Sequence, residues 1–236
     1  MYNELLIITS ALPVCASADE YRTAIVDDNV LGKPTTSSRQ KSFRHVVQLY
    51  GMDPSLILFH TLRIVAEESP ESLPMLGLVC AFARDPQLRH SFKLIESLRP
   101  GEEMPRIRME EHFESGFPGR FSESMKKSLA QNVNTSWGIG GHLTGRTRKY
   151  RAIPASNSPA TTYATFAGYL LGLRGDLLLQ STFVRLVEAN TSLAISQLGT
   201  ASARGWLRFR HGGGITEIDF DTWMERHKQE VSDGTR

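Results

Sequence analysis

The chain has few cysteines and no long apolar run, and both shortages restrict what it can be. Its two cysteines, Cys15 and Cys80, lie far apart and have no nearby ligand pattern. Neither a disulfide framework nor a zinc cluster is therefore indicated. No apolar run approaches the roughly 20 residues that a membrane-spanning helix requires. We therefore expect a soluble, cytoplasmic protein without a membrane partner.

The N-terminus also lacks one feature of a secretory signal. Residues 5–12 are mostly apolar, and residues 16–18 resemble a small-residue cleavage site. A signal peptide would also need a basic start, and the chain offers Glu4 instead. We therefore assign the apolar segment to a first core helix.

Motifs of the common enzyme classes are missing as well. The glycines of residues 138–141 and 212–214 form no Walker loop and lie in no βαβ unit. The seven histidines show no HExxH-type spacing, and no GxSxG turn occurs. The sequence therefore predicts a non-enzymatic protein that uses no cofactor and no metal.

A cluster of acidic residues keeps one catalytic alternative open. Its members are Glu102, Glu103, Glu110, Glu111 and Glu114. A metal-dependent nuclease uses such carboxylates, but no Lys or His is arranged alongside them. A solvated helix face more often explains a charge run of this kind, so the nuclease is our third hypothesis.

Positive charge is concentrated in the middle of the chain. The whole protein carries a formal charge of only +2, yet seven Lys or Arg and one acid, Glu123, lie between Gly119 and Arg151. A local excess of this kind is the electrostatic signature of a nucleic-acid contact.

The helix predicted from Ser122 onward is the centre of this basic region. Its apolar side would carry Met125, Leu129, Val133, Ser136 and Trp137. We expect DNA contacts from the other side, with Lys126, Lys127, Gln131 and Asn134. An ordinary solvated amphipathic helix explains the same helix pattern.

Glycines end this helix, and residues 142–153 could then fold back as a hairpin. The predicted phosphate contacts on this hairpin are Arg146, Arg148, Lys149 and Arg151. Residues 105–115 would form the preceding helix. The order of elements favours a winged helix-turn-helix over about residues 105–154.

The N-terminal part is predicted to be an all-α bundle over residues 1–100, with its end marked by Arg99-Pro100-Gly101. Its helix from about residue 38 to 50 shows clear helical periodicity. A second basic cluster lies there and consists of Lys33, Arg39, Lys41 and Arg44. Phosphate contact and a solvated face both remain open for it.

Residues 101–236 are predicted to hold a second winged module over about residues 176–225. A helix after Asn190 would lead into a hairpin of residues 206–220, whose turn is glycine-rich. The DNA contacts expected here are Arg204, Arg208 and Arg210. The fold class is therefore mainly α with short β-hairpins.

Short motifs spread over nearly the whole chain resemble a known family. They are Asn29-Val30-Leu31-Gly32-Lys33, Thr36-Ser37-Ser38, Ser136-Trp137, Gly141-His142-Leu143, Gly145-Arg146 through Arg151, and the hairpin of residues 205–220. In these motifs the chain is similar to the BrxA-like proteins of BREX phage-defence systems.

The resemblance implies a helical protein in which helix-turn-helix modules lie beside positive surfaces and bind DNA. It also implies a role in a system that methylates host DNA and blocks phage, and it supplies no catalytic residues. The leading hypothesis is a non-enzymatic accessory protein that binds double-stranded DNA, with other defence-system proteins as further candidate partners. The alternative is a protein-interaction scaffold that docks onto a methyltransferase or an ATPase, since winged helices also bind proteins.

Overall fold

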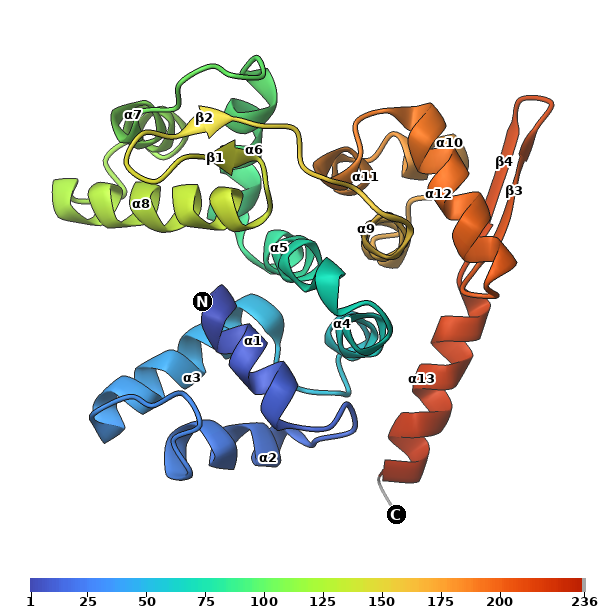
Figure 1. The fold of residues 1–236 in the computed structure, drawn as a ribbon, viewed down its shortest axis with the longest axis horizontal. Coiled ribbons are helices and arrows are strands. Elements are labelled where there is room, and N and C mark those ends of the chain that lie inside the picture. Colours follow the sequence, from blue (N-terminus) through green and yellow to red (C-terminus); the bar gives the residue numbers. More distant parts are fainter. Residues whose placement is uncertain (235–236) are drawn as a thin grey trace. The chain divides into compact units, whose positions relative to one another are not determined.

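A computed structural model describes the backbone of residues 1–234, with side chains through residue 229, and is mainly helical (Figure 1). The N-terminal elements are α1 (Tyr2–Ala11), α2 (Ala18–Arg22), the π-helical turn η1 (Thr23–Asp27), α3 (Thr36–Tyr50), α4 (Ile57–Glu68), the 3-10 turn η2 (Pro70–Ser72), α5 (Leu73–Arg84) and α6 (Pro86–Ser97). The later elements are α7 (Arg106–Gly116), α8 (Glu123–Ile139), β1 (Leu143–Thr144), β2 (Tyr150–Arg151), α9 (Ser158–Leu170), α10 (Gly175–Leu179), α11 (Thr182–Val187), α12 (Thr191–Ala203), β3 (Arg208–Gly212), β4 (Ile215–Asp219) and α13 (Asp221–Gly234). The predicted mainly-α class is confirmed. None of the helices that the structure describes is both long and apolar enough to cross a membrane.

Side-chain caps explain where many of these helices begin. The Ser17 hydroxyl accepts a hydrogen bond from the Glu20 amide, and the Ser17 amide donates to the Glu20 carboxylate, which together form a capping box. Asp85 accepts from the amide of Gln87 at 2.8 Å, with Pro86 as the first helical residue. Asn190 caps α12 in the same way. A cap supplies partners for amides that have none within the helix, so polar residues fix the helix boundaries.

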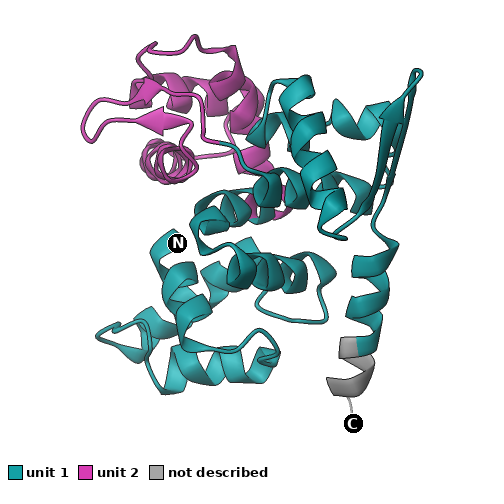
Figure 2. Cartoon of the chain, turned by 45° about the vertical axis from the view of Figure 1, so that its right-hand side comes forward, with its two compact units in different colours: residues 1–80, 156–236 teal, residues 81–155 magenta. Residues whose placement is uncertain are grey.

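The chain divides into two compact units (Figure 2). Unit 1 comprises residues 1–80 and 156–236, and unit 2 comprises residues 81–155. The predicted boundary near residue 101 therefore falls inside unit 2, and the two expected winged modules lie in different units. The boundary lies earlier than predicted because α6 packs with α7 and α8 and so belongs to unit 2. Its start at Asp85-Pro86 looks like the start of any other helix in the N-terminal bundle, so the sequence does not show this.

Helix α9 is the central helix of unit 1. Residues 159–168 are all buried, and most are small or apolar. A helix that is apolar on every side must be surrounded by protein, and α9 contacts α4, α10, α11 and α12. The hydroxyl of Tyr163 donates to the carbonyl of Leu58 in the α4 region at 2.9 Å. These contacts join α4 to α10, α11 and α12 within one unit. We call α10, α11, α12 and the β3–β4 hairpin the C-terminal module of unit 1.

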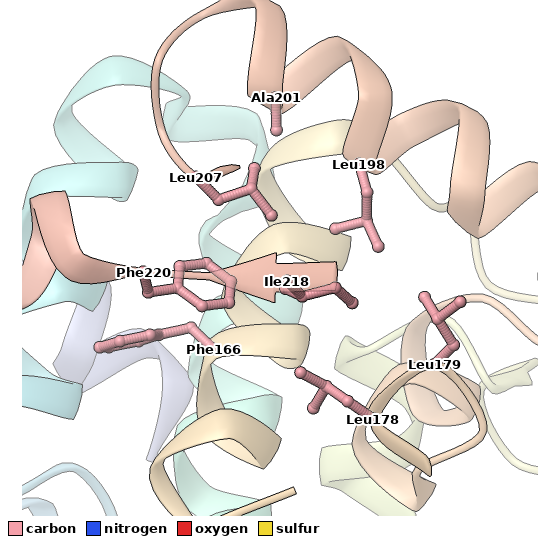
Figure 3. Packing of buried hydrophobic residues seen from close by; sticks show 8 residues of the cluster. All are labelled: Phe166, Leu178, Leu179, Leu198, Ala201, Leu207, Ile218 and Phe220. Atoms are coloured by element: carbon pink, nitrogen blue, oxygen red, sulfur yellow. The ribbon is translucent and has the colours of Figure 1, made fainter. Parts of the chain in front are cut away.

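One hydrophobic cluster holds the C-terminal module of unit 1 together (Figure 3). Phe166 of α9 and Phe220, which follows β4, face one another with ring centroids 5.0 Å apart. The other buried members are Leu178, Leu179, Leu198, Ala201, Leu207 and Ile218. They come from α10, α12 and the β3–β4 hairpin, so the hairpin is anchored to the helices by its inner face.

The core of unit 2 forms around Trp137 of α8. Its indole stacks on Phe92 of α6 with centroids 5.5 Å apart, and its Nε1 donates to the Ser91 hydroxyl at 2.9 Å. The indole is fully buried, and a buried indole N–H requires such a partner. Phe113 of α7 is also fully buried. These contacts fix α6, α7 and α8 as one three-helix assembly.

Candidate nucleic-acid interface

Helices α7 and α8 pack against each other and are joined by a short turn, as the sequence predicts. Helix α8 begins after Ser122, whose hydroxyl accepts a hydrogen bond from the amide of Met125 at 3.4 Å. Gly119 lies in the turn with φ +67°, a conformation that glycine adopts readily. The predicted helix, turn and second helix are therefore confirmed.

The buried face of α8 is rotated from the predicted one. It consists of Lys126, Ala130, Val133, Asn134 and Trp137. Met125, which we expected to be buried, is 55% exposed. Lys126 and Asn134, which we predicted to contact DNA, are therefore turned toward the protein and do not lie on the exposed face of α8.

Ion pairing explains how a lysine occupies that face. The Nζ of Lys126 lies 2.8 Å from Oε2 of Glu114 on α7 and 2.6 Å from Oε1 of Glu123. Hydrogen bonds to the two carboxylates raise the pKa of Lys126. Asn134 is only 6% exposed, and its Oδ1 has no hydrogen-bond partner among the described residues. Both side chains belong to the packing of α8.

The exposed face of α8 is a band of uncharged polar side chains. Its members are Ser124, Ser128, Gln131, Asn132 and Thr135. We call this set the polar band. Only Gln131 was predicted, and the signal that could have found the others is the i, i+4, i+7 spacing from Ser124 through Ser128 to Gln131. Such hydroxyl and amide groups can donate to and accept from base edges. Lys127 is exposed beside the band.

The β1–β2 hairpin follows α8, and we call it the first hairpin. Leu143 pairs with Arg151 and Thr144 with Tyr150. The segment of residues 101–104 runs along the other edge of β2, where Gly101 donates to the carbonyl of Arg151 at 2.8 Å. The order in unit 2 is therefore α6, an extended segment, α7, α8 and a hairpin. Strand β2 therefore lies between β1 and the segment of residues 101–104 in a small three-stranded arrangement.

The four basic residues predicted on the first hairpin divide into two kinds. Arg146 and Arg148 are exposed, and neither guanidinium has a hydrogen bond or ion pair within the described part of the chain. Lys149 instead donates from Nζ to the carbonyl of Gly145 at 2.7 Å. Arg151 donates to the carbonyls of His142 and Ala152, and burial lowers its pKa.

Lys149 and Arg151 therefore hold the hairpin together, and their role as phosphate contacts stays a prediction. The exposed arginines lie in a stretch of sequence without acids, since no Asp or Glu occurs between Glu123 and Asp176; an acid placed beside this hairpin is Glu103, which is bridged to Tyr150 of β2. The positive electrostatic potential at Arg146 and Arg148 is therefore not reduced by acids that neighbour them in sequence.

The N-terminal basic cluster of Lys33, Arg39, Lys41 and Arg44 also contains both engaged and exposed side chains. Lys33 pairs with Glu4 at 3.0 Å, and Arg39 donates to the carbonyl of Val26 at 3.0 Å, which ties α3 to the end of η1. Lys41 and Arg44 are exposed on α3. Half of this predicted cluster is therefore engaged in the fold of unit 1.

The C-terminal module contains the expected helix and hairpin. Helices α11 and α12 are separated by residues 188–190, and the β3–β4 hairpin follows; we call it the second hairpin. Its turn is Gly213-Gly214 with φ of +59° and +78°, which are the values that a tight two-residue hairpin turn needs. Both elements agree with the sequence prediction.

Acidic residues face the arginines of the second hairpin. Arg208 lies 2.8 Å from the carboxylates of both Asp219 and Asp221. Arg210 is exposed and is the cross-strand partner of Glu217. Cross-strand pairs of opposite charge stabilise a hairpin, and they also reduce its attraction for phosphate. The second hairpin is therefore far closer to neutral than the first.

Other polar residues of this module also make internal contacts. The guanidinium of Arg204 lies 5.8 Å from the centre of the Trp206 ring, a cation–π contact, and it remains exposed. Gln197 of α12 accepts a hydrogen bond from Thr161 at 2.5 Å and donates to Ser156. Gln197 therefore joins α12 to α9 rather than to a ligand.

The acidic cluster of unit 2 is largely engaged with cations. Glu102 pairs with Arg108 at 2.6 Å, and Glu110 pairs with Arg106 at 2.6 Å. Glu114 pairs with Lys126, as described above. In the part of the chain that the structure describes, no three His, Cys, Asp or Glu side chains gather as metal ligands.

Comparison of the chain with known protein families, with curated proteins and with solved structures finds no match.

Proposed function

We propose that this chain is a non-enzymatic, double-stranded DNA-binding accessory protein of a BREX-type phage-defence system. The observation that carries the DNA-binding part is the composition of one surface of unit 2. The polar band of α8 is followed by a hairpin that exposes Arg146 and Arg148 in a stretch without acids.

The order of elements in unit 2 supports assignment as a winged helix-turn-helix. In this assignment α7 and α8 are the two helices of the motif, and α8 is the recognition helix. The first hairpin is the wing. The capped start of α8 and the fixed pair of α7 and α8 supply the rigid scaffold that groove binding requires.

The polar band and the wing have different chemistry, and this supports a division of labour. Amides and hydroxyls such as Gln131 form directional hydrogen bonds that can distinguish bases in the major groove. Exposed arginines instead attract phosphates of any sequence and release condensed counterions. A surface that combines both is suited to a DNA duplex.

The role in phage defence is supported by the sequence resemblance to BrxA-like proteins. A DNA-binding component would bring a defence assembly to the duplex on which the other components act. The proposal places this action in the cytoplasm and assigns the chemistry to those partners.

The second hairpin favours a second candidate function, which is protein docking. Its arginines face carboxylates, and a groove of about 550 Å³ lies along it. Leu177 of α10 and Ile215 of β4 are exposed by 71% and 66% in the same module. A nearly neutral surface with exposed apolar side chains is better suited to a protein than to phosphates. Unit 1 would then bind a partner while unit 2 binds DNA.

A gel-shift titration with duplex DNA at low and moderate salt tests the proposal. We expect a shift at low salt that weakens steeply as salt rises. A duplex that never shifts would favour the docking function instead. Cleavage on addition of Mg²⁺ or Mn²⁺ would favour the nuclease hypothesis.

A further inference from the structure

The loop between β1 and β2, residues 145–149, is closed by contacts of its own backbone and is named here the wing loop. Gly145 has φ +93°, and a Cβ at this position would collide with the carbonyl oxygen of Arg148. The Nζ of Lys149 then bonds the Gly145 carbonyl across the base of the loop. A glycine requirement and a bond across the base restrict the loop to a narrow shape.

The wing loop presents only cationic and neutral side chains at its tip. Arg146 and Arg148 are both exposed, and Thr147 between them is exposed as well. Figure 2 shows the loop extending outward from unit 2 beyond the two strands. The wing loop is therefore a narrow projection that carries two guanidinium groups separated by one residue.

The widths of the two DNA grooves determine which groove can admit a helix and which can admit a narrow loop. The major groove, about 12 Å wide, admits a helix, whereas the minor groove is only about 6 Å wide. Minor grooves of A·T tracts are narrower still and have an enhanced negative potential that attracts arginine. Guanidinium groups are also more weakly hydrated than ammonium groups, so they enter a narrow groove more readily.

We infer that Arg146 and Arg148 insert into the minor groove of A·T-rich duplex DNA. The inference rests on the proposed function and deepens it, because it names the class of duplex that the wing loop selects. The preference has a chemical cause: a G·C pair places the guanine N2 amino group in the minor groove, where it repels a cation and occupies space. An A·T pair offers only acceptors there.

Three short duplexes that differ in one central tract test the inference. The tract consists of A·T, G·C or inosine·cytosine pairs, and affinity is measured by fluorescence anisotropy at one salt concentration. Inosine·cytosine keeps the major-groove pattern of G·C and lacks the minor-groove amino group. We expect the A·T and inosine·cytosine duplexes to bind alike, and both roughly tenfold more tightly than the G·C duplex.

Charge-conserving variants assign the preference to the wing loop. Arg146→Lys with Arg148→Lys keeps the net charge and changes exposed side chains only, so the fold is retained. We expect this double variant to bind the three duplexes with nearly equal affinity. Arg210→Lys on the second hairpin is the matched control and should keep the full preference.

Three outcomes would overturn the inference. Equal binding of all three duplexes by the unchanged protein would show that no minor-groove selection exists. An inosine·cytosine duplex that behaves like G·C would locate the selection in the major groove. A preference that survives the double lysine variant would exclude the wing loop. In each case DNA binding itself, and hence the proposed function, would stand, whereas absence of binding to every duplex would overturn both.

Discussion

Lys126 of α8 and Glu114 of α7 form an ion pair with 2.8 Å between Nζ and Oε2. The pair directs the side chain of Lys126 toward α7. From its position in the basic stretch of the sequence, Lys126 was expected to contact DNA instead. The pair also holds Lys126 on the face of α8 that buries Val133 and Trp137. The exposed side carries the polar band, so this contact between two helices positions the proposed recognition surface.

Replacement of Lys126 and of its neighbour Lys127 should have opposite effects. Lys126→Ala removes the ion pairs with Glu114 and Glu123, so we expect a lower melting temperature and an unchanged salt dependence of DNA binding. Lys127→Ala should leave the melting temperature unchanged and flatten the plot of log K against log salt, by about 0.9 if one phosphate contact is lost. Thermal melting and anisotropy titrations on both variants measure this contrast. Equal effects of the two variants on DNA binding would contradict the assignment.

Gln131 and Asn134 provide a matched pair for sequence readout. Gln131 is exposed in the polar band, whereas Asn134 is buried. Gln131→Ala should reduce the preference among duplex sequences by about 1–3 kcal/mol if the amide makes a bidentate base contact, and it should leave the salt slope unchanged. Asn134→Ala should leave both affinity and preference intact. Competition binding with a library of duplexes measures the preference, and an Asn134→Ala protein that loses it would refute the orientation of α8.

The two hairpins should differ in their contribution to DNA affinity. Among the residues whose side chains the structure describes, Arg148 has no acidic partner, whereas Arg208 is paired with Asp219 and Asp221. Arg148→Ala should flatten the salt slope by about 0.9, and Arg208→Ala should change it much less. Anisotropy titrations over a range of salt concentrations give both slopes. A larger effect of Arg208→Ala would mean that the second hairpin is the main phosphate contact.

A pair of histidines between α6 and α7 should make unit 2 sensitive to acid. The rings of His90 and His112 stack with centroids 4.3 Å apart, and each Nε2 lies within 3.3 Å of the other residue's carbonyl oxygen. Burial lowers the pKa of His112 below its ordinary value of 6.5, and the neighbouring His90 lowers it further, although the hydrogen bond to the His90 carbonyl opposes this.

Because the pKa of His112 is lower in the folded state, the unfolded chain binds the proton more readily. This contribution to stability is complete above pH 6.5 and decreases as the pH falls from there toward the folded-state pKa. Thermal melting should therefore show a decrease between neutral and mildly acidic pH that is smaller in His112→Gln, whose amide can still donate to the carbonyl. An identical decrease in the variant would exclude His112 as the cause.

Helix boundaries were the most predictable part of the fold. Ser122, Asp85 and Asn190 are polar caps whose effect is local, so the sequence reveals them directly. The rotation of α8 was not predictable in this way. It depends on Glu114, a residue on another helix, because a paired lysine stem can be buried where an unpaired lysine cannot.

The division into units was missed for a similar reason. The assignment of α6 to unit 2 depends on Trp137, which lies 46 residues after its hydrogen-bond partner Ser91. The roles of Lys149 and Arg151 were equally hidden, because their partners are backbone carbonyls that any sequence possesses. The sequence revealed where charge is concentrated, and the structure was needed to separate Arg146 and Arg148, which are exposed, from the cations engaged in the fold.

Whether unit 2 binds duplex DNA through the wing loop is decided by the salt dependence of binding, measured for the unchanged protein and for the double variant Arg146→Ala with Arg148→Ala. We expect the unchanged protein to bind at low salt and to lose affinity steeply as salt rises. The double variant should have a slope smaller by about 1.8, which corresponds to two phosphate charges that are no longer neutralised. Identical slopes for a double variant that melts at the same temperature as the unchanged protein, or no binding at low salt by the unchanged protein, would contradict the account.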